Sequence, residues 1–266
     1  MLKKGLEYFV LNIWLTMRTR LTYRAATILK LCVNLFLTIL YIYLWKAIYG
    51  GRELVNGFTL QDMLSYIFLS RIFRNLYPYG ISGAYGELIK SGQIAVSLLR
   101  PVRIELQLLS ASAGSALYDF IFCGLPSLVL FHLFVPGQGA DFAVFPKMVL
   151  WVFASCVFVS LLELTIGTLS YYTQNLWGLN VFKTAVISFL SGELLPIQFY
   201  PARLMALFEC LPFASIYYIP VLLFLGKTVG DLRMYLVVLW GSNAFLMLVY
   251  LFLSKRMIRH ITVQGG

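Results

Sequence analysis

Long apolar runs separated by short polar stretches dominate this chain of 266 residues. A helix rises 1.5 Å per residue, so about 20 consecutive apolar residues cross the ~30 Å hydrocarbon core of a bilayer. The pattern therefore predicts an all-α integral membrane fold with six transmembrane helices. We expect these helices at residues 26–48, 62–82, 104–134, 144–172, 180–196 and 233–254.

The first 24 residues have a different pattern. Apolar side chains such as Leu6, Val10 and Trp14 recur at helical spacing, while basic side chains occupy other positions. Such a segment (residues 1–24) favours an amphipathic helix that lies in the headgroup plane of the membrane. A poorly ordered basic tail is the alternative.

Residues 191–226 are apolar but hold four of the nine prolines, which are Pro196, Pro201, Pro212 and Pro220. Proline removes a backbone donor and clashes with the preceding turn, so a straight spanning helix is not expected. At membrane depth, broken helix persists only where protein or a water-filled cavity satisfies the freed backbone groups. We therefore expect re-entrant half-helices over residues 193–226, of the kind that belong to transport pathways.

Composition and charge support a single membrane domain over residues 1–266. The chain is 60% hydrophobic and 12% charged, whereas soluble domains carry about 25% charged residues. Its net charge is +10, but the basic residues gather at the ends of the apolar runs. That distribution favours membrane lipids as partners over nucleic acid. The four cysteines show no metal-ligand spacing, so we expect no metal site.

The basic residues also predict the orientation. With six spans and both termini in the cytoplasm, eleven basic residues lie on the inner side and five on the outer side, which satisfies the positive-inside rule. If residues 191–226 made a seventh crossing, the basic cluster at residues 255–259 would lie outside. An even number of spans is therefore favoured.

Two arginines in the second predicted span, Arg71 and Arg74, are three residues apart and share one helix face. Charges at that depth normally face the interior of a helix bundle and pair. Asp119, in the third span, falls at a similar depth when its helix is counted from the cytoplasmic end. We predict an intramembrane charge pair of Arg71 and Arg74 with Asp119, with a packing role favoured over substrate contact.

The loop between the second and third spans, residues 84–103, is expected on the cytoplasmic side. Residues 87–96 predict one short helix that exposes Glu87 and Lys90. Such a helix would suit docking of a soluble partner, and a plain solvated connector is equally compatible with the pattern.

Two further polar features are candidate functional sites. Residues 80–83 spell GxSG, as in some intramembrane serine proteases, but both histidines are predicted far from Ser82. Glu193 precedes the first proline of the broken segment, where it would either bind a cation or, as we favour, cap a half-helix.

No GxxxxGK[ST] motif is present, so we do not expect the chain to be an enzyme that hydrolyses nucleotide. Active transport would take its energy from another subunit or from an ion gradient.

Two blocks carry a family resemblance, GQIAVSLLRPV after the second span and GELLPIQFYPARLMALFECLPFASIYYIPVLLFLG before the last. Together with the amphipathic N-terminus and six spans, they resemble the permease subunits of ABC-2-type exporters. The bacterial permeases for antibiotic or multidrug export are the most similar branch. The resemblance covers essentially the whole chain.

The resemblance implies a bacterial cell membrane protein that works with two ATP-binding subunits and a second permease chain, identical or sister. This chain would need no cofactor, because ATP and Mg²⁺ would bind in the partner. Residues 87–96 would form the coupling helix, closed by Arg100 and Pro101. Residues 193–226, with Glu193 and the four prolines, would form the extracellular gate. The residues that carry these implied roles are Glu87, Lys90, Arg100 and Pro101 for coupling, and Glu193, Pro196, Pro201, Pro212 and Pro220 for the gate.

The function expected from these observations is ATP-driven export of a hydrophobic or amphipathic substrate by alternating access. An ion-coupled secondary transporter is the main alternative, and a membrane-embedded enzyme using Ser82 is a weaker one.

Overall fold

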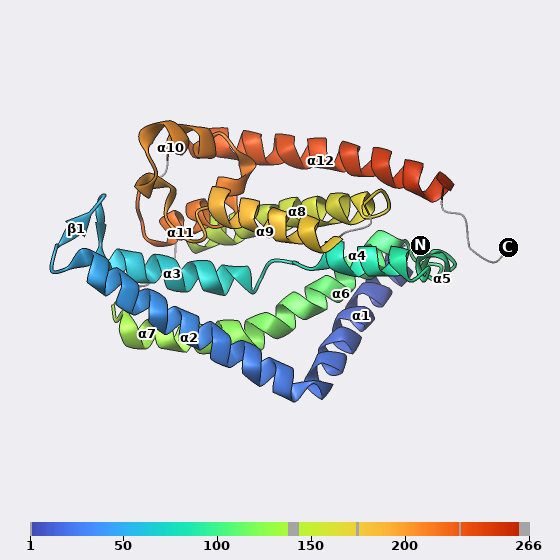
Figure 1. The fold of residues 1–266 in the computed structure, drawn as a ribbon, viewed down its shortest axis with the longest axis horizontal. Coiled ribbons are helices and arrows are strands. Elements are labelled where there is room, and N and C mark those ends of the chain that lie inside the picture. Colours follow the sequence, from blue (N-terminus) through green and yellow to red (C-terminus); the bar gives the residue numbers. More distant parts are fainter. Residues whose placement is uncertain (1, 138–143, 174–175, 229, 261–266) are drawn as a thin grey trace.

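Helices make up most of the chain in a computed structural model that describes residues 2–137, 144–173, 176–228 and 230–260 (Figure 1). The first half contains α1 (Leu2–Thr22), α2 (Arg24–Tyr49), α3 (Leu60–Arg74), α4 (Ile81–Lys90), α5 (Ile94–Leu98), α6 (Ile104–Asp119) and α7 (Leu125–Phe134). The second half contains α8 (Phe145–Leu169), α9 (Leu176–Leu190), α10 (Ala202–Glu209), α11 (Tyr218–Phe224) and α12 (Leu232–His260).

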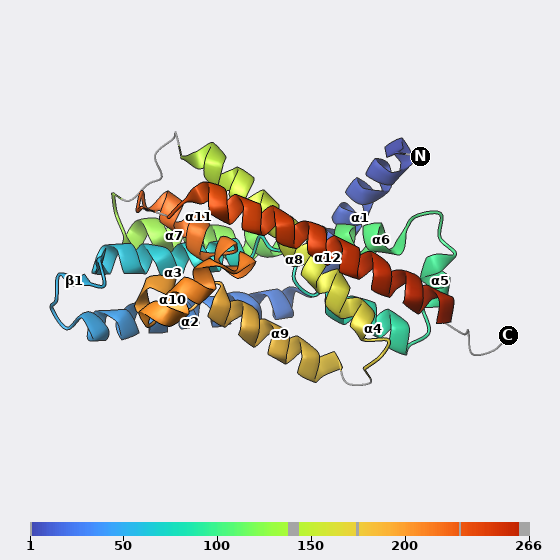
Figure 2. The same cartoon turned by 90° about the horizontal axis from the view of Figure 1, so that it is seen from above.

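Different elements of the fold lie at the two ends of the bundle. Both ends of the described chain lie at the same end as α4 and α5, and the strands and α10 lie at the opposite end (Figure 1). Seen from above, α12 runs along the bundle across α8 (Figure 2). Helices α4 and α5 and both ends of the described chain therefore share one end of the molecule.

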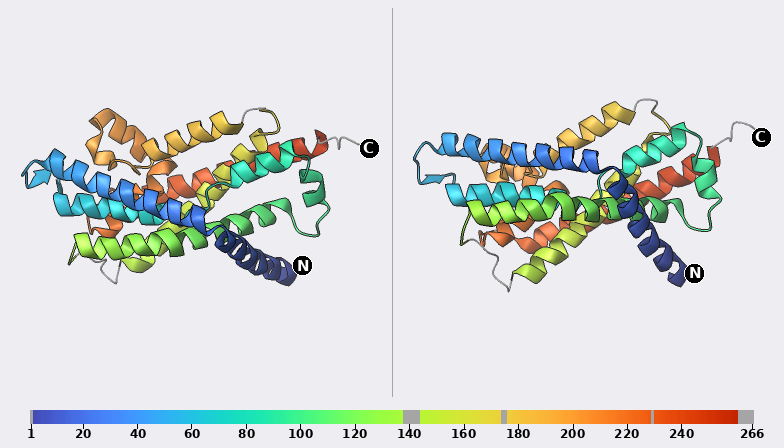
Figure 3. Two further views of the ribbon diagram at one scale, coloured as in Figure 1. Left: turned by 60° about the horizontal axis from the view of Figure 1, so that its bottom comes forward. Right: turned by 90° about the horizontal axis from the view of Figure 1, so that it is seen from below.

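Helix α1 leaves the bundle at an angle to α2 and packs against α6 (Figure 3). The crossing is close at Gly114, where an added Cβ would lie 2.8 Å from the carbonyl oxygen of Ile13. The Asn12 amide fixes the same contact by donating to Ser110 Oγ at 2.6 Å. The helix expected over residues 2–24 is thus present as α1, and it packs closely against α6 at Gly114.

A short hairpin joins α2 to α3. Strands β1 (Leu54–Val55) and β2 (Phe58–Thr59) pair antiparallel, and β2 leads directly into α3. The Thr59 hydroxyl accepts from the Asp62 N–H, and the Asp62 carboxylate accepts from the Thr59 N–H. This reciprocal cap satisfies two of the otherwise unpaired donors at the start of α3.

The second predicted span, 62–82, is not one helix. Helix α3 ends at Arg74, and a non-helical stretch that includes Pro78 separates it from α4. Gly80 precedes α4 with φ of +94°, a backbone conformation that favours glycine. Proline removes a backbone donor, which explains why helix does not continue through this stretch.

The third predicted span is continuous but not regular. A π-helical turn, η1 (Phe120–Gly124), lies between α6 and α7 and follows Asp119 directly. Such turns insert one extra residue into an α-helix. The helical run over residues 104–134 therefore has the predicted length of 31 residues and is apolar enough to cross a bilayer.

The proline-rich segment forms short helices, and each proline lies at or near the start of one. Pro196 precedes the 3₁₀ turn η2 (Ile197–Phe199), Pro201 precedes α10, Pro212 begins η3 (Pro212–Ser215), and Pro220 lies in the first turn of α11. Proline fits these positions because it has no N–H to leave unsatisfied there. The axis bends by 75° between residues 202–209 and 212–224.

This segment is also central to the packing. Ile216, Tyr217 and Val221 are fully buried in the main apolar cluster, together with residues of α3, α8 and α12. Pro196 and Pro220 are buried and Pro212 is partly buried, so protein surrounds the interrupted backbone at these positions. Pro201 and most of α10 are exposed.

Four described helices are long and apolar enough to cross a bilayer, which are residues 24–49, 104–134, 145–169 and 232–258. The bent segment would make a fifth if it crossed, and Trp177–Leu190 is a shorter apolar helix. The fold is therefore an all-α, multi-pass membrane bundle, and the count of six spans stays a prediction.

Candidate functional site

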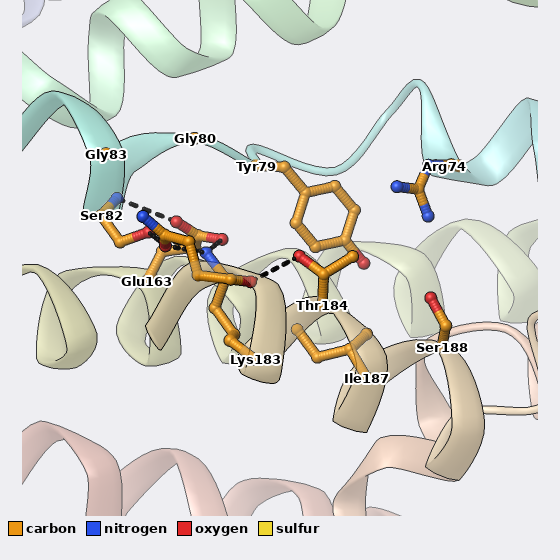
Figure 4. Close-up of a pocket in the computed structure, with 11 residues that line it drawn as sticks. Arg74, Tyr79, Gly80, Ser82, Gly83, Glu163, Lys183, Thr184, Ile187 and Ser188 are labelled. Carbon is orange, nitrogen blue, oxygen red and sulfur yellow. Dashed lines mark hydrogen bonds and ion pairs between the residues drawn. The ribbon is translucent and has the colours of Figure 1, made fainter. Parts of the chain in front are cut away.

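A polar cavity of about 230 Å³ lies between the start of α4, Glu163 of α8 and residues 180–188 of α9 (Figure 4). Buried charged side chains are rare in proteins unless they are paired, so a cavity lined by two of them, Glu163 and Lys183, is the natural place to look for function. Its lining residues are Arg74, Tyr79, Gly80, Ser82, Gly83, Glu163, Asn180, Lys183, Thr184, Ile187 and Ser188.

Lys183 is the centre of the polar cluster in this cavity. Its Nζ donates to Glu163 Oε1 at 2.5 Å, to Ser82 Oγ at 2.7 Å and to Asn180 Oδ1 at 3.0 Å. These bonds use all three N–H donors of an ammonium. Glu163 and Ser82 are fully buried, and Lys183 is 8% exposed. The cluster joins α4, α8 and α9 through one cation.

The carboxylate of Glu163 is held on its other side by the beginning of α4. Its Oε2 accepts from the backbone N–H of Ser82 at 2.9 Å, in the first turn of α4, where the helix dipole favours a negative charge. One turn further along α8, Gly167 lets α4 approach closely, since an added Cβ would lie 2.8 Å from the Tyr85 ring. Tight packing and charge together fix α4 on α8.

A second cavity of about 290 Å³ adjoins the first, and Arg74 and Ser188 line both. Its charged residues are Arg71, Arg74 and Glu193. Glu193 pairs with the Arg74 guanidinium through one oxygen and accepts from Ser188 Oγ at 2.6 Å through the other. In Figure 4, Arg74 and Ser188 lie at one end of the first cavity, and the Lys183 cluster lies at the other.

The predicted pair of Arg71 and Arg74 with Asp119 is wrong. Asp119 pairs with Lys30 at 2.7 Å and with Arg20 at 3.2 Å, because the corner between α1 and α2 lies beside the end of α6. Arg74 pairs with Glu193 instead.

Arg71 makes a different contact. Its Nη1 donates to Asn34 Oδ1 at 3.1 Å, and its guanidinium lies 5.1 Å from the centre of the Tyr41 ring. Glu193 contacts Arg74 and Ser188, and no side-chain hydrogen bond caps the 3₁₀ turn η2 that follows it.

The basic side chain next to Ser82 of the GxSG motif is Lys183 and not a histidine, which the sequence analysis did not predict. Ser82 Oγ accepts from Lys183 and donates to Asn180 at 2.7 Å. An ammonium whose donors are all engaged has no lone pair to accept the serine proton, so this arrangement suits structure rather than nucleophilic attack. Among the described residues, no group of three or more His, Cys, Asp and Glu side chains is arranged to hold a metal.

The predicted coupling residues lie at the end of the bundle that carries the termini. Glu87 and Lys90 are exposed on the last turn of α4. The single helix predicted over residues 87–96 is wrong, since α4 ends at Lys90 and Gly92, with φ of +71°, separates it from α5.

Past α5, Arg100 donates to Gln107 Oε1 at 3.2 Å, and Pro101 lies in the exposed turn before α6. This contact ties the end of the loop to the first turn of α6.

The long apolar helices define a polytopic, all-α membrane protein. Residues 32–263 match the family model described as ABC-2 family transporter protein. The chain thus belongs to the ABC-2 transporter family, and it is a transmembrane permease of an ABC transporter. In general such permeases work with an ABC ATPase. A search of curated proteins finds no match.

Proposed function

We propose that this chain is the membrane subunit of an ATP-driven exporter in the bacterial cell membrane. It would move a hydrophobic or amphipathic substrate by alternating access, powered by two copies of a separate ATP- and Mg²⁺-binding subunit. A second permease chain, identical or sister, would complete the pathway. The observation that carries the proposal is the link from the exposed end of α4 to the buried cluster around Lys183.

The placement of the ends supports cytoplasmic termini. Both ends of the described chain, the start of α1 and the end of α12, lie at the end of the bundle with α4 and α5 (Figure 1). The start of α1 contains Lys3 and Lys4, and the last turns of α12 contain Lys255. Basic residues concentrate on the cytoplasmic side of membrane proteins. The opposite end, with the hairpin and α10, would then face outward.

The coupling step would begin at Glu87, Lys90, Arg100 and Pro101. An ATPase that pushes α5 would also move α4, because only three residues separate these two helices. The other end of α4 contacts Glu163 through Ser82, so its motion would reach α8 and α9. From α9, the chain continues directly into Glu193 and the proposed outer gate at Pro196, Pro201, Pro212 and Pro220.

Co-purification and ATPase assays test this function. The chain should isolate with an ATPase subunit, and the double variant Glu87→Ala/Lys90→Ala should assemble normally but lose transport-coupled ATP hydrolysis. The matched control is Arg52→Ala/Glu53→Ala, which removes an exposed pair of opposite charges at the other end of the bundle. Normal coupling in the first variant would contradict the docking role. Transport that stops when the ion gradient collapses, with ATP present, would favour the ion-coupled alternative.

A further inference from the structure

The second cavity contains a cation that no carboxylate neutralises directly. Among the residues the structure describes, the ion pairs of this cavity consist of Arg74 with Glu193 alone, and Arg71 has only the neutral amide of Asn34 as a hydrogen-bond acceptor. Two arginines and one glutamate line the space. The cavity therefore carries an excess of one positive charge.

The position of this charge makes it costly in the absence of a ligand. Arg71 is eleven residues from the start of α3, which is about 16 Å along the helix axis. If α3 lies in the bilayer as part of the second predicted span, this would place Arg71 near the middle of a ~30 Å hydrocarbon core. An intramembrane arginine without an anionic partner is unfavourable and commonly marks a substrate or ion pathway. Arg71 is only partly exposed, so water compensates it incompletely.

The Asn34 contact holds the guanidinium in place without neutralising it. Asn34 itself donates to Ser127 Oγ at 3.1 Å, so α2, α3 and α7 fix the orientation of Arg71 together. The Tyr41 ring covers one side of the guanidinium. A fixed planar guanidinium with free N–H groups matches the geometry of a carboxylate or a phosphate.

The remaining wall is apolar and continues outside the cavity. Leu37, Tyr41, Ile67 and Leu194 contribute to the lining. Leu37, Tyr41 and Leu44 lie at helical spacing on one face of α2, and the Leu37 and Leu44 side chains are 37% and 45% exposed. An alkyl chain could lie along this face while a charged group occupies the cavity.

We propose that the second cavity binds the anionic head of an amphiphile, a carboxylate or phosphate, at Arg71, with its apolar chain along α2. The proposal deepens the export function above by naming its substrate class as anionic amphiphiles. Arg74 stays paired with Glu193 and borders the site, so the bound anion compensates the Arg71 charge. A cationic amphiphile would meet repulsion in the same place.

A binding assay on the purified full-length chain in neutral maltoside micelles tests this site. The probes are dodecanoate, dodecyl phosphate and dodecylammonium, each carrying the same terminal fluorophore. Wild type should bind both anionic probes, and Arg71→Gln should weaken them about tenfold or more, the usual loss for a hydrogen bond to a charged group. Lys46→Gln is the matched control. The Lys46 ammonium also lies over an aromatic ring, that of Tyr43, but Lys46 does not line the cavity.

A second variant keeps the test decisive if Arg71→Gln does not fold. Leu37→Glu places a carboxylate at a half-exposed lining position and leaves Arg71 intact. It should cause the same loss of anionic probe binding. Unchanged anionic binding in a folded variant of either kind, or wild-type binding of the cationic probe as tight as that of the anionic probes, would overturn the proposal.

The source of the amphiphile is distinguished in bilayer discs. If a membrane lipid occupies the site, phosphatidylglycerol should displace the dodecyl phosphate probe, whereas phosphatidylcholine should not. If the ligand is a single-chain molecule, the probe should bind equally in both. The assay needs neither nucleotide nor partner, so its failure would leave the export function standing.

Discussion

The ammonium of Lys183 lies 2.5 Å from Oε1 of Glu163, and both side chains are buried. Burying two charges costs several kcal/mol of hydration for each ion, and the attraction between them offsets that cost only while both are present. The pair therefore makes α8 and α9 depend on each other.

Removing one partner should be worse than removing both. Lys183→Met should lower the free energy of unfolding by about 3–5 kcal/mol, since it leaves the Glu163 carboxylate buried and unpaired. The double variant Lys183→Met/Glu163→Gln should recover much of that loss. Thermal unfolding of the purified chain in detergent, followed by light scattering, measures both effects. A double variant no more stable than Lys183→Met would contradict the dependence.

The ion pair of Arg74 with Glu193 predicts a charge-reversal pattern. Arg74→Glu should destabilise the chain by about 1 kcal/mol, a modest amount because the arginine is half-exposed. Adding Glu193→Arg should restore the melting temperature. Adding Asp119→Arg is the matched control and should not, since Asp119 pairs with Arg20 and Lys30. Rescue by the control would show that the pairing has been assigned to the wrong acid.

The contact of α1 with α6 depends on the absence of a side chain at Gly114. Gly114→Ala would bring a Cβ to 2.8 Å from backbone oxygen of Ile13, and relieving such overpacking costs about 1–3 kcal/mol. The variant should expose α1 to limited proteolysis and lower the melting temperature. Gly241→Ala on α12 serves as the control, because its Cβ would meet nothing within 4 Å. It should leave both readouts at wild-type values, and equal behaviour of the two variants would contradict the close crossing.

Much of the secondary structure could be predicted because local signals agree with the fold. The amphipathic N-terminus predicted helix over residues 2–24, and α1 covers Leu2–Thr22. The proline spacing predicted a broken segment, and each proline lies at or near the start of a short helix. These features depend on residues close together in sequence.

The pairing of charges could not be predicted in the same way. Counting depth along each helix placed Asp119 near Arg71 and Arg74, but it took no account of where the corner between α1 and α2 lies. Lys183 was missed although a signal was present, because a lone lysine in an apolar helix requires an acid nearby. The sequence contains few such acids, and Glu163 is one of them.

The π-helical turn between α6 and α7 has a consequence for Arg71. In a regular helix, positions eight residues apart such as Asp119 and Ser127 point about 80° away from each other, and the one extra residue of a π turn reduces this to about 20°. Both side chains can then face α2, where Asp119 meets Lys30 and Ser127 meets Asn34. Asn34 also accepts a hydrogen bond from Arg71. The direction of the Arg71 guanidinium therefore depends on the five-residue π-helical turn between α6 and α7, although Arg71 itself lies on α3.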